Sequence, residues 1–135
     1  MNVKELMIGN WVKNKNDLPV RVMHIEGTMI RVDAPRHQNA PNRSHDHVEN
    51  FSGVDLTASI VKSAGFKNGV GPRLTLPLKR DKYTCYLWLE FIDDRVYMFT
   101  VDDGHDYHLV DDIRQLHRLQ NLYFAIMGVE LKVDL

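Results

Sequence analysis

The chain has 135 residues, of which 44% are hydrophobic and 26% are charged, an ordinary composition for a folded protein that excludes wholesale disorder. Its 17 basic and 18 acidic residues give a formal net charge of -1, which excludes binding to nucleic acid through overall charge alone. A chain of this length is expected to form one domain, residues 1–135, whose core needs neither metal nor disulfide support.

The first part of the chain, residues 1–33, predicts short strands joined by turns. The residues that carry the pattern, on either side of a turn at Glu26 and Gly27, are Val20, Val22, His24, Met29, Ile30 and Val32. Strands of this length favour a small antiparallel SH3-like sheet. Residues 34–50 hold prolines, asparagines and histidines with few apolar side chains, and they are predicted to form an exposed loop.

Residues 54–65 predict a short helix. Leu56, Ile60 and Val61 have helical spacing, and either Asp55 or Thr57 suits the N-cap. Gly65 stands where a helix often ends in a left-handed residue, so Phe66 is expected to pack back on the helix.

Residues 73–101 predict an antiparallel meander of three strands. The runs "RLTLPLK", "KYTCYLWLEF" and "RVYMFTVD" are separated by spacings that suit tight hairpins. Alternation at Leu74, Leu76 and Leu78 gives the meander an apolar face. Cys85, the only cysteine, lies in the second run and is expected to be a small buried hydrophobe.

The last part of the chain predicts an amphipathic helix over residues 111–127, after a polar and acidic stretch. Asp111 or Asp112 suits the start of this helix and Gly128 suits its end. Residues 129–133 predict a short strand. The expected fold class is therefore α+β: a small SH3-like N-terminal sheet and an antiparallel meander packed against the C-terminal helix.

A cytoplasmic location is expected. No stretch approaches the roughly 18 consecutive apolar residues of a membrane-spanning helix, so no membrane partner is predicted. The segment "MNVKELMIGNWV" does not have the pattern of a secretion signal, and one cysteine suits a reducing compartment.

Histidines in two polar segments are the candidate metal ligands. His45 and His47 lie in one segment, and His105 and His108 lie in the other with Asp106 between them. Imidazole and carboxylate groups bind divalent metals such as zinc, but the spacing matches no closed zinc signature, and loop histidines are usually solvated. No cofactor is predicted, and a divalent metal remains an alternative.

A second group of candidates flanks the central hairpin: Arg73, Lys79, Arg80, Lys82 and Tyr83. Basic side chains close to aromatic rings, here with Tyr86 and Trp88 next in sequence, bind phosphates and stack on nucleobases. The alternative is that these charges are simply solvated at a hairpin turn.

His117, Gln120 and Asn121 interrupt the apolar pattern of the C-terminal helix. Half-buried polar groups need hydrogen-bond partners, so we expect them to bind loop or strand backbone at the edge of the core. The alternative is that His117 and Asn121 contact a ligand.

No diagnostic catalytic motif is present. "KNGVGPR" lacks the Gly-Lys-Ser/Thr ending of a phosphate-binding loop, and no serine has a nucleophile-elbow context. The sequence therefore favours a protein that is not an enzyme.

Blocks along the whole chain resemble a family of small proteins from phages, prophages and conjugative elements of the Bacteroides group. The blocks are "IGNWV" at residues 8–12, Leu-Thr at 56–57 with Gly-Phe at 65–66, "HRLQNLYFA" at 117–125 and "GVEL" at 128–131. The resemblance implies an accessory protein of a mobile element that binds a host protein, a nucleotide signal or nucleic acid.

The leading hypothesis is a non-enzymatic binding module, which could form a homodimer. One alternative is a sponge that sequesters a cyclic-nucleotide signal of host defence. Another is a metal-assisted phosphodiesterase or nuclease that uses histidines and aspartates of the polar segments.

Overall fold

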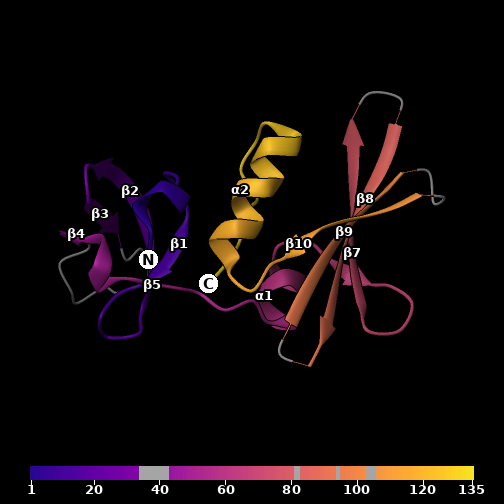
Figure 1. The fold of residues 1–135 in the computed structure, drawn as a ribbon, viewed down its shortest axis with the longest axis horizontal. Coiled ribbons are helices and arrows are strands. Elements are labelled where there is room, and N and C mark those ends of the chain that lie inside the picture. Colours follow the sequence, from indigo (N-terminus) through magenta and orange to yellow (C-terminus); the bar gives the residue numbers. More distant parts are fainter. Residues whose placement is uncertain (34–42, 81–82, 94, 103–105) are drawn as a thin grey trace. The chain divides into compact units, whose positions relative to one another are not determined.

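The computed structural model describes residues 1–33, 43–80, 83–93, 95–102 and 106–135 (Figure 1). The fold is mixed α+β, as predicted, with antiparallel sheets and a C-terminal helix. Contacts divide the chain into two compact units. Unit 1 comprises Met1–Asp55 and Gln115–Ala125, and unit 2 comprises Leu56–Arg114 and Ile126–Leu135.

Unit 1 contains a five-stranded antiparallel sheet of order β4-β3-β2-β1-β5. Its strands are β1 (Trp11–Lys13), β2 (Pro19–Glu26), β3 (Met29–Asp33), β4 (Arg43–His47) and β5 (Ser52–Gly53). Two 3-10 turns, η1 (Val3–Glu5) and η2 (Val48–Asn50), precede β1 and β5 respectively. The core of the unit consists of Leu6, Val12, Val20, Val22, Ile30, Val32, Val48 and Phe51.

Two predictions for unit 1 need correction. Residues 43–50, expected as loop, contain β4 and η2, because β4 completes its backbone hydrogen bonds against β3 in a register from Met29↔His47 to Asp33↔Arg43. A polar strand at a sheet edge has no apolar alternation to reveal it. The alternation predicted His24 on the same face as the buried Val22, but His24 is exposed. A register shift between the two residues interrupts the alternation of β2. Residues 34–42 of the predicted loop lie outside the described residues.

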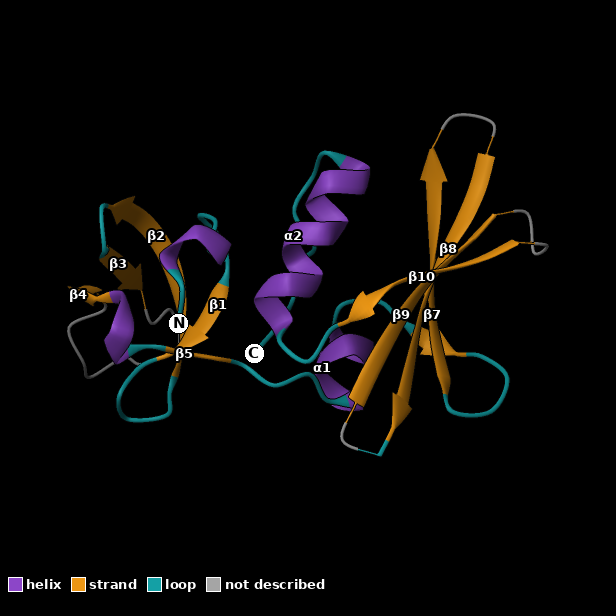
Figure 2. Ribbon diagram, in the orientation of Figure 1, coloured by secondary structure: helices purple, strands orange, loops and turns teal. Residues whose placement is uncertain are grey.

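Unit 2 contains the predicted meander within a sheet of order β10-β9-β8-β7-β6 (Figure 2). Its strands are β6 (Lys67–Asn68), β7 (Arg73–Arg80), β8 (Tyr83–Ile92), β9 (Arg95–Asp102) and β10 (Asp106–Asp112). One face is apolar and buried; its buried members are Leu74, Leu78, Leu87, Leu89, Val96 and Met98. A helix, α1 (Ala58–Ser63), packs beside β7, and a Cβ on Gly65 would lie 3.6 Å from Leu76 Cδ1 on this face. The opposite face carries exposed side chains, among them Lys67, Lys79 and Tyr86.

The helix α1 is shorter than the predicted 54–65 but has the predicted caps. Thr57 accepts a hydrogen bond from Ile60 N as the N-cap. Gly65 has φ +101°, which favours glycine, and Phe66 is buried with its N–H donated to Val61 O.

The C-terminal helix, α2 (Leu116–Met127), begins five residues later than predicted. The reason is that Asp111 and Asp112 belong to β10, where Asp112 pairs with Tyr97 of β9. Gly128 has φ +70° and ends the helix as predicted, but residues 129–133 form no strand. The helix residues up to Ala125 belong to unit 1, and the packing of the helix on the meander stays a prediction. No helix within the described ranges is both long and apolar enough to span a bilayer.

Candidate functional site

The open face of the unit 2 sheet gathers basic and aromatic side chains from four strands, β6 to β9. Residues directly opposite each other in an antiparallel pair share a face. The register pairs Arg73 with Glu90, Thr75 with Trp88, and Glu90 in turn with Tyr97. We call this the open face, and its described members are Lys67, Arg73, Thr75, Pro77, Lys79, Tyr86, Trp88, Glu90, Ile92, Arg95 and Tyr97.

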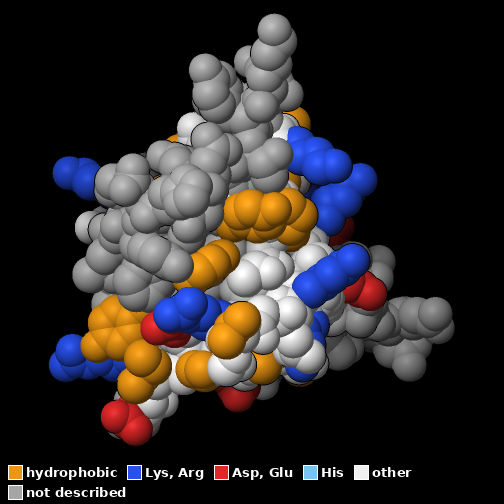
Figure 3. All heavy atoms as spheres, turned by 90° about the vertical axis from the view of Figure 1, so that its right-hand side faces the viewer, with side chains coloured by type: hydrophobic (Ala, Val, Ile, Leu, Met, Phe, Trp, Pro, Cys, Tyr) orange, Lys and Arg blue, Asp and Glu red, His pale blue; other side chains and the backbone are white. Residues whose placement is uncertain are grey.

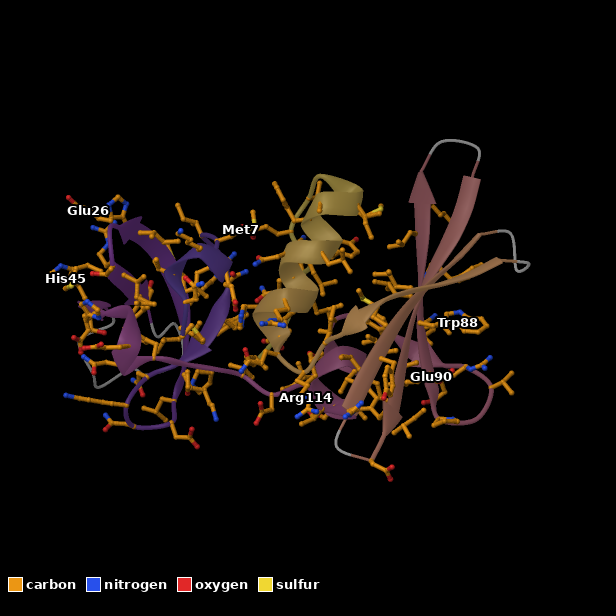
Figure 4. All side chains as sticks on the ribbon, in the orientation of Figure 1. Met7, Glu26, His45, Trp88, Glu90 and Arg114 are labelled. Carbon is orange, nitrogen blue, oxygen red and sulfur yellow. The ribbon has the colours of Figure 1, made fainter. Side chains whose placement is uncertain are left out.

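Arg73, Trp88 and Glu90 form a fixed group at the centre of this face. The guanidinium carbon of Arg73 lies 4.5 Å from the centroid of the Trp88 ring, within the range of a cation–π contact. Arg73 Nε also donates a hydrogen bond to Glu90 Oε1, and the Glu90 side chain is only 15% exposed. Figure 4 shows Trp88 and Glu90 projecting from the side of the sheet away from α1. The carboxylate therefore helps to hold the guanidinium over the indole ring.

Other aromatic rings and cations surround this group. Tyr86 is 36% exposed, and Tyr97 is half-buried and accepts a hydrogen bond of 3.4 Å from Arg95 Nη1. Lys67 and Lys79 are exposed on the same face. Figure 3 shows lysine and arginine side chains beside hydrophobic ones on the side of the molecule that it presents. Among the side chains that the structure describes in β6 to β9, Glu90 is the only acidic one.

The structure brings together only part of the predicted hairpin site. Arg73 and Lys79 lie on the open face. Arg80 and Tyr83 are paired with each other at the ends of β7 and β8, but their side chains, and the whole of Lys82, lie outside what is described. The sequence prediction missed Lys67, Glu90, Arg95 and Tyr97 as members of the face. The short spacing between the runs "RLTLPLK" and "KYTCYLWLEF" was the signal that could have found Glu90, because a tight hairpin sets the pairing of the two strands.

Gln120 and Asn121 of α2 have the structural role expected for them. Gln120 is buried; its Oε1 accepts from Trp11 N at 3.0 Å and its Nε2 donates to Gly9 O at 3.2 Å. Asn121 Nδ2 donates to Glu5 O at 2.7 Å, and Asn121 Oδ1 accepts from Asn10 Nδ2 at 2.9 Å. The two side chains thus join α2 to the N-terminal segment of unit 1. These bonds use both ends of the Asn121 amide, and a ligand role for Asn121 stays a prediction.

His117, the third polar residue of α2, is fully buried in unit 1. Neither ring nitrogen has a hydrogen-bond partner among the described residues, and Nε2 lies 3.8 Å from Glu5 Oε2. Burial lowers the pKa of His117, the Glu5 carboxylate acts in the opposite direction, and the Arg118 guanidinium lowers it further. The imidazole is therefore held neutral at neutral pH, beside an exposed contact of 3.4 Å between Arg118 and Glu5.

The candidate metal ligands are divided between the two units. His45 and His47 lie on β4 in unit 1, and Asp106 and His108 lie on β10 in unit 2 with undescribed side chains. His105 is outside the described residues. Within the portion of the chain that is described, no three histidine, cysteine or carboxylate side chains are grouped to hold a metal ion.

The neighbours of His45 and His47 are engaged in a local turn. Asp46 accepts hydrogen bonds of 2.8 Å from Asn50 Nδ2 and from His47 N, and the bond from Asn50 is the main cause that lowers the pKa of Asp46. His47 Nδ1 accepts from Glu49 N at 3.4 Å and caps η2. These contacts give Asp46 and His47 a structural role in the turn.

Comparison with known proteins adds no further constraint: no family model, no curated protein and no solved structure matches the chain.

Proposed function

We propose that the chain is a non-enzymatic binding protein, which holds an anionic ligand with an aromatic ring system, a nucleotide or nucleic acid, on the open face of unit 2. The single observation that carries the proposal is the Arg73 guanidinium stacked on Trp88 and fixed by Glu90. A guanidinium ordered before binding loses little further freedom when it meets a phosphate or stacks on a base.

The rest of the open face supports the same ligand class. Tyr86 and Tyr97 supply two more aromatic rings, and Lys67, Lys79 and Arg95 supply positive charge around them. Stacking accounts for the aromatic part of the ligand and the cations account for its phosphates. None of these side chains is a general base beside a nucleophile, which favours binding over catalysis.

The finer character of unit 1 is also a proposal. We propose that its sheet is SH3-like, on the basis of the order β4-β3-β2-β1-β5 and the 3-10 turn η2 immediately before β5. In this proposal the chain is an accessory protein of a mobile element in which unit 1 is the scaffold and unit 2 carries the ligand.

The test is a titration with mononucleotides, a cyclic dinucleotide and a mixed-sequence oligonucleotide at two salt concentrations, with recovery of the ligand afterwards. We expect at least one of them to bind, more weakly at the higher salt concentration, and to be recovered intact. Arg73→Ala should weaken binding, and Arg31→Ala, an exposed arginine on β3 of unit 1, is the matched control. Absence of all binding, or cleavage of the bound ligand, would contradict the proposal.

A further inference from the structure

We infer that the ligand of the open face is single-stranded nucleic acid, whose bases stack on Tyr86, Trp88–Arg73 and Tyr97 while its phosphates meet the surrounding cations. The inference rests on the proposed function of that face and narrows its ligand class. It depends on the number of aromatic rings, on where the charges lie, and on which nucleic acids expose their bases.

The aromatic rings are too many for one nucleotide. Tyr86 and Trp88 are two residues apart on β8, which places them about 6–7 Å apart along the strand. Tyr97 lies on the neighbouring strand β9, opposite Glu90. Because Glu90 follows Trp88 on the same face of β8, Tyr97 continues the direction from Tyr86 to Trp88. A single base covers about one ring, so three rings in succession suit a ligand with several bases in series.

The charges lie around the rings rather than among them. Lys79 lies two residues after Pro77 on β7, past the Pro77–Tyr86 pair. Lys67 lies on the outer strand β6, opposite Thr75. Arg95 lies two residues before Tyr97 on β9, at the other end of the row of rings. The Glu90 carboxylate, at the centre, neutralises Arg73 and repels phosphate. This arrangement directs a phosphate backbone to the margin and bases to the centre, as a single strand with splayed bases provides.

The exposure of the bases separates a single strand from a duplex. A duplex keeps its bases stacked inside and presents phosphates, so it leaves aromatic rings unused. Single strands expose the ring faces that Tyr86, Trp88 and Tyr97 can contact.

Tryptophan fluorescence provides the test, since the chain has two tryptophans and the other one, Trp11, is buried in unit 1. In a Trp11→Phe background, Trp88 is the sole reporter. We would titrate this protein with thymidine monophosphate, with single-stranded dT and rU oligonucleotides of about twelve nucleotides, and with a duplex of equal length. We expect quenching by dT or rU, with affinity at least about tenfold higher than for the mononucleotide and for the duplex at the same salt.

Two variants test the stacking platforms. Tyr86→Ala and Tyr97→Ala should each weaken oligonucleotide binding about five- to a hundredfold, the range measured for the loss of one base–aromatic stack. Tyr123→Ala, a half-buried tyrosine of α2 in unit 1, is the matched control and should bind as the parent does. Circular dichroism of each variant confirms that it is folded before its affinity is compared.

The failures of the two proposals are distinguishable. Equal affinity for the mononucleotide and the oligonucleotides, or tighter binding of the duplex, would overturn the single-strand inference and leave the proposed nucleotide-binding function standing. Loss of affinity in Tyr123→Ala as large as in Tyr86→Ala would also overturn the inference. If none of the monophosphate, the single strands and the duplex binds, the single-strand inference fails, and so does the proposal that the open face binds nucleic acid.

Discussion

His117 is a buried imidazole without a hydrogen-bond partner among the described residues, which is an unusual state for a polar side chain. Its neutral form fits the site, because desolvation disfavours the imidazolium more than the half-exposed Glu5 carboxylate favours it. Protonation would place a positive charge in the core of unit 1 beside the Arg118 guanidinium. The residue thus gives unit 1 a dependence on pH.

We predict that His117 makes folding less favourable in mild acid. Its pKa is lower in the folded than in the unfolded chain, so the unfolded chain binds the proton more readily. The contribution of neutral His117 to stability is complete above the unfolded pKa, about 6.5, and is lost as the pH falls through the lowered folded value. The measurement is urea unfolding of the parent and of His117→Gln at about pH 7.5 and about pH 5.5.

The His117→Gln variant should lose less stability between the two pH values than the parent does. Gln120→Ala serves as control, because it disturbs the same helix without removing a titratable group and should keep the parent's pH dependence. A His117→Gln variant whose stability falls as steeply with acid as that of the parent would show that another group is responsible.

The helix α2 joins the N-terminal segment of unit 1 through side-chain bonds to backbone. Gln120 satisfies the N–H of Trp11 and the carbonyl of Gly9, and both bonds are buried. Removal of the amide takes away the printed partner of the Trp11 N–H and leaves the Gly9 carbonyl only the 3.4 Å hydrogen bond from Arg21 Nε. A buried backbone group without a partner costs about 1–3 kcal/mol. These two hydrogen bonds explain why a polar residue, Gln120, lies within the apolar stripe of the helix.

We predict that Gln120→Ala lowers the free energy of unfolding by about 1–3 kcal/mol, measured by urea denaturation. Arg118→Ala is the matched control on the same helix, since Arg118 is exposed and contacts Glu5 only at 3.4–3.5 Å. Its cost should be less than about 1 kcal/mol. Equal costs for the two variants would contradict a special role for the buried amide.

The elements that the sequence predicted well are those with a local signal. The caps of α1, the glycines that end α1 and α2, and the alternation of the meander depend on neighbours in sequence. β4 and β10 depend instead on ladders with β3 and β9, and their polar residues resemble loops. The start of α2 moved for the same reason, because β10 continues through Asp112.

The candidate site could likewise be predicted from the sequence only where its residues are close together in the chain. Composition identified Arg73 and Lys79 with Trp88 close by, because basic and aromatic residues cluster there in sequence. Composition could not identify Glu90 as the partner of Arg73, because Glu90 lies seventeen residues away in sequence. Only the register of β7 and β8 brings the two side chains together. Lys67 and Arg95 come from other strands and join the face for the same reason.

At the scale of the whole molecule, the chain forms two units, each with its own sheet and core. The chain passes from unit 1 to unit 2 after Asp55, returns at Gln115 and leaves again after Ala125. Unit 1 is therefore completed by α2, a segment far from its strands in sequence. All residues assigned to ligand binding above belong to unit 2.

This division predicts where a bound oligonucleotide slows hydrogen exchange. Backbone amides of β7, β8 and β9 should exchange more slowly in the complex, because the ligand stabilises the sheet on which its contacts lie. Amides of β2 and β3 in unit 1 should be unchanged, and they form the internal reference within each spectrum. The measurement is mass-spectrometric exchange of the parent and of Tyr86→Ala at equal oligonucleotide concentration, where the variant should lose most of the protection. Protection concentrated on β2 and β3 would move the binding site to unit 1, and would leave the stacked Arg73 and Trp88 as a structural pair of the second sheet.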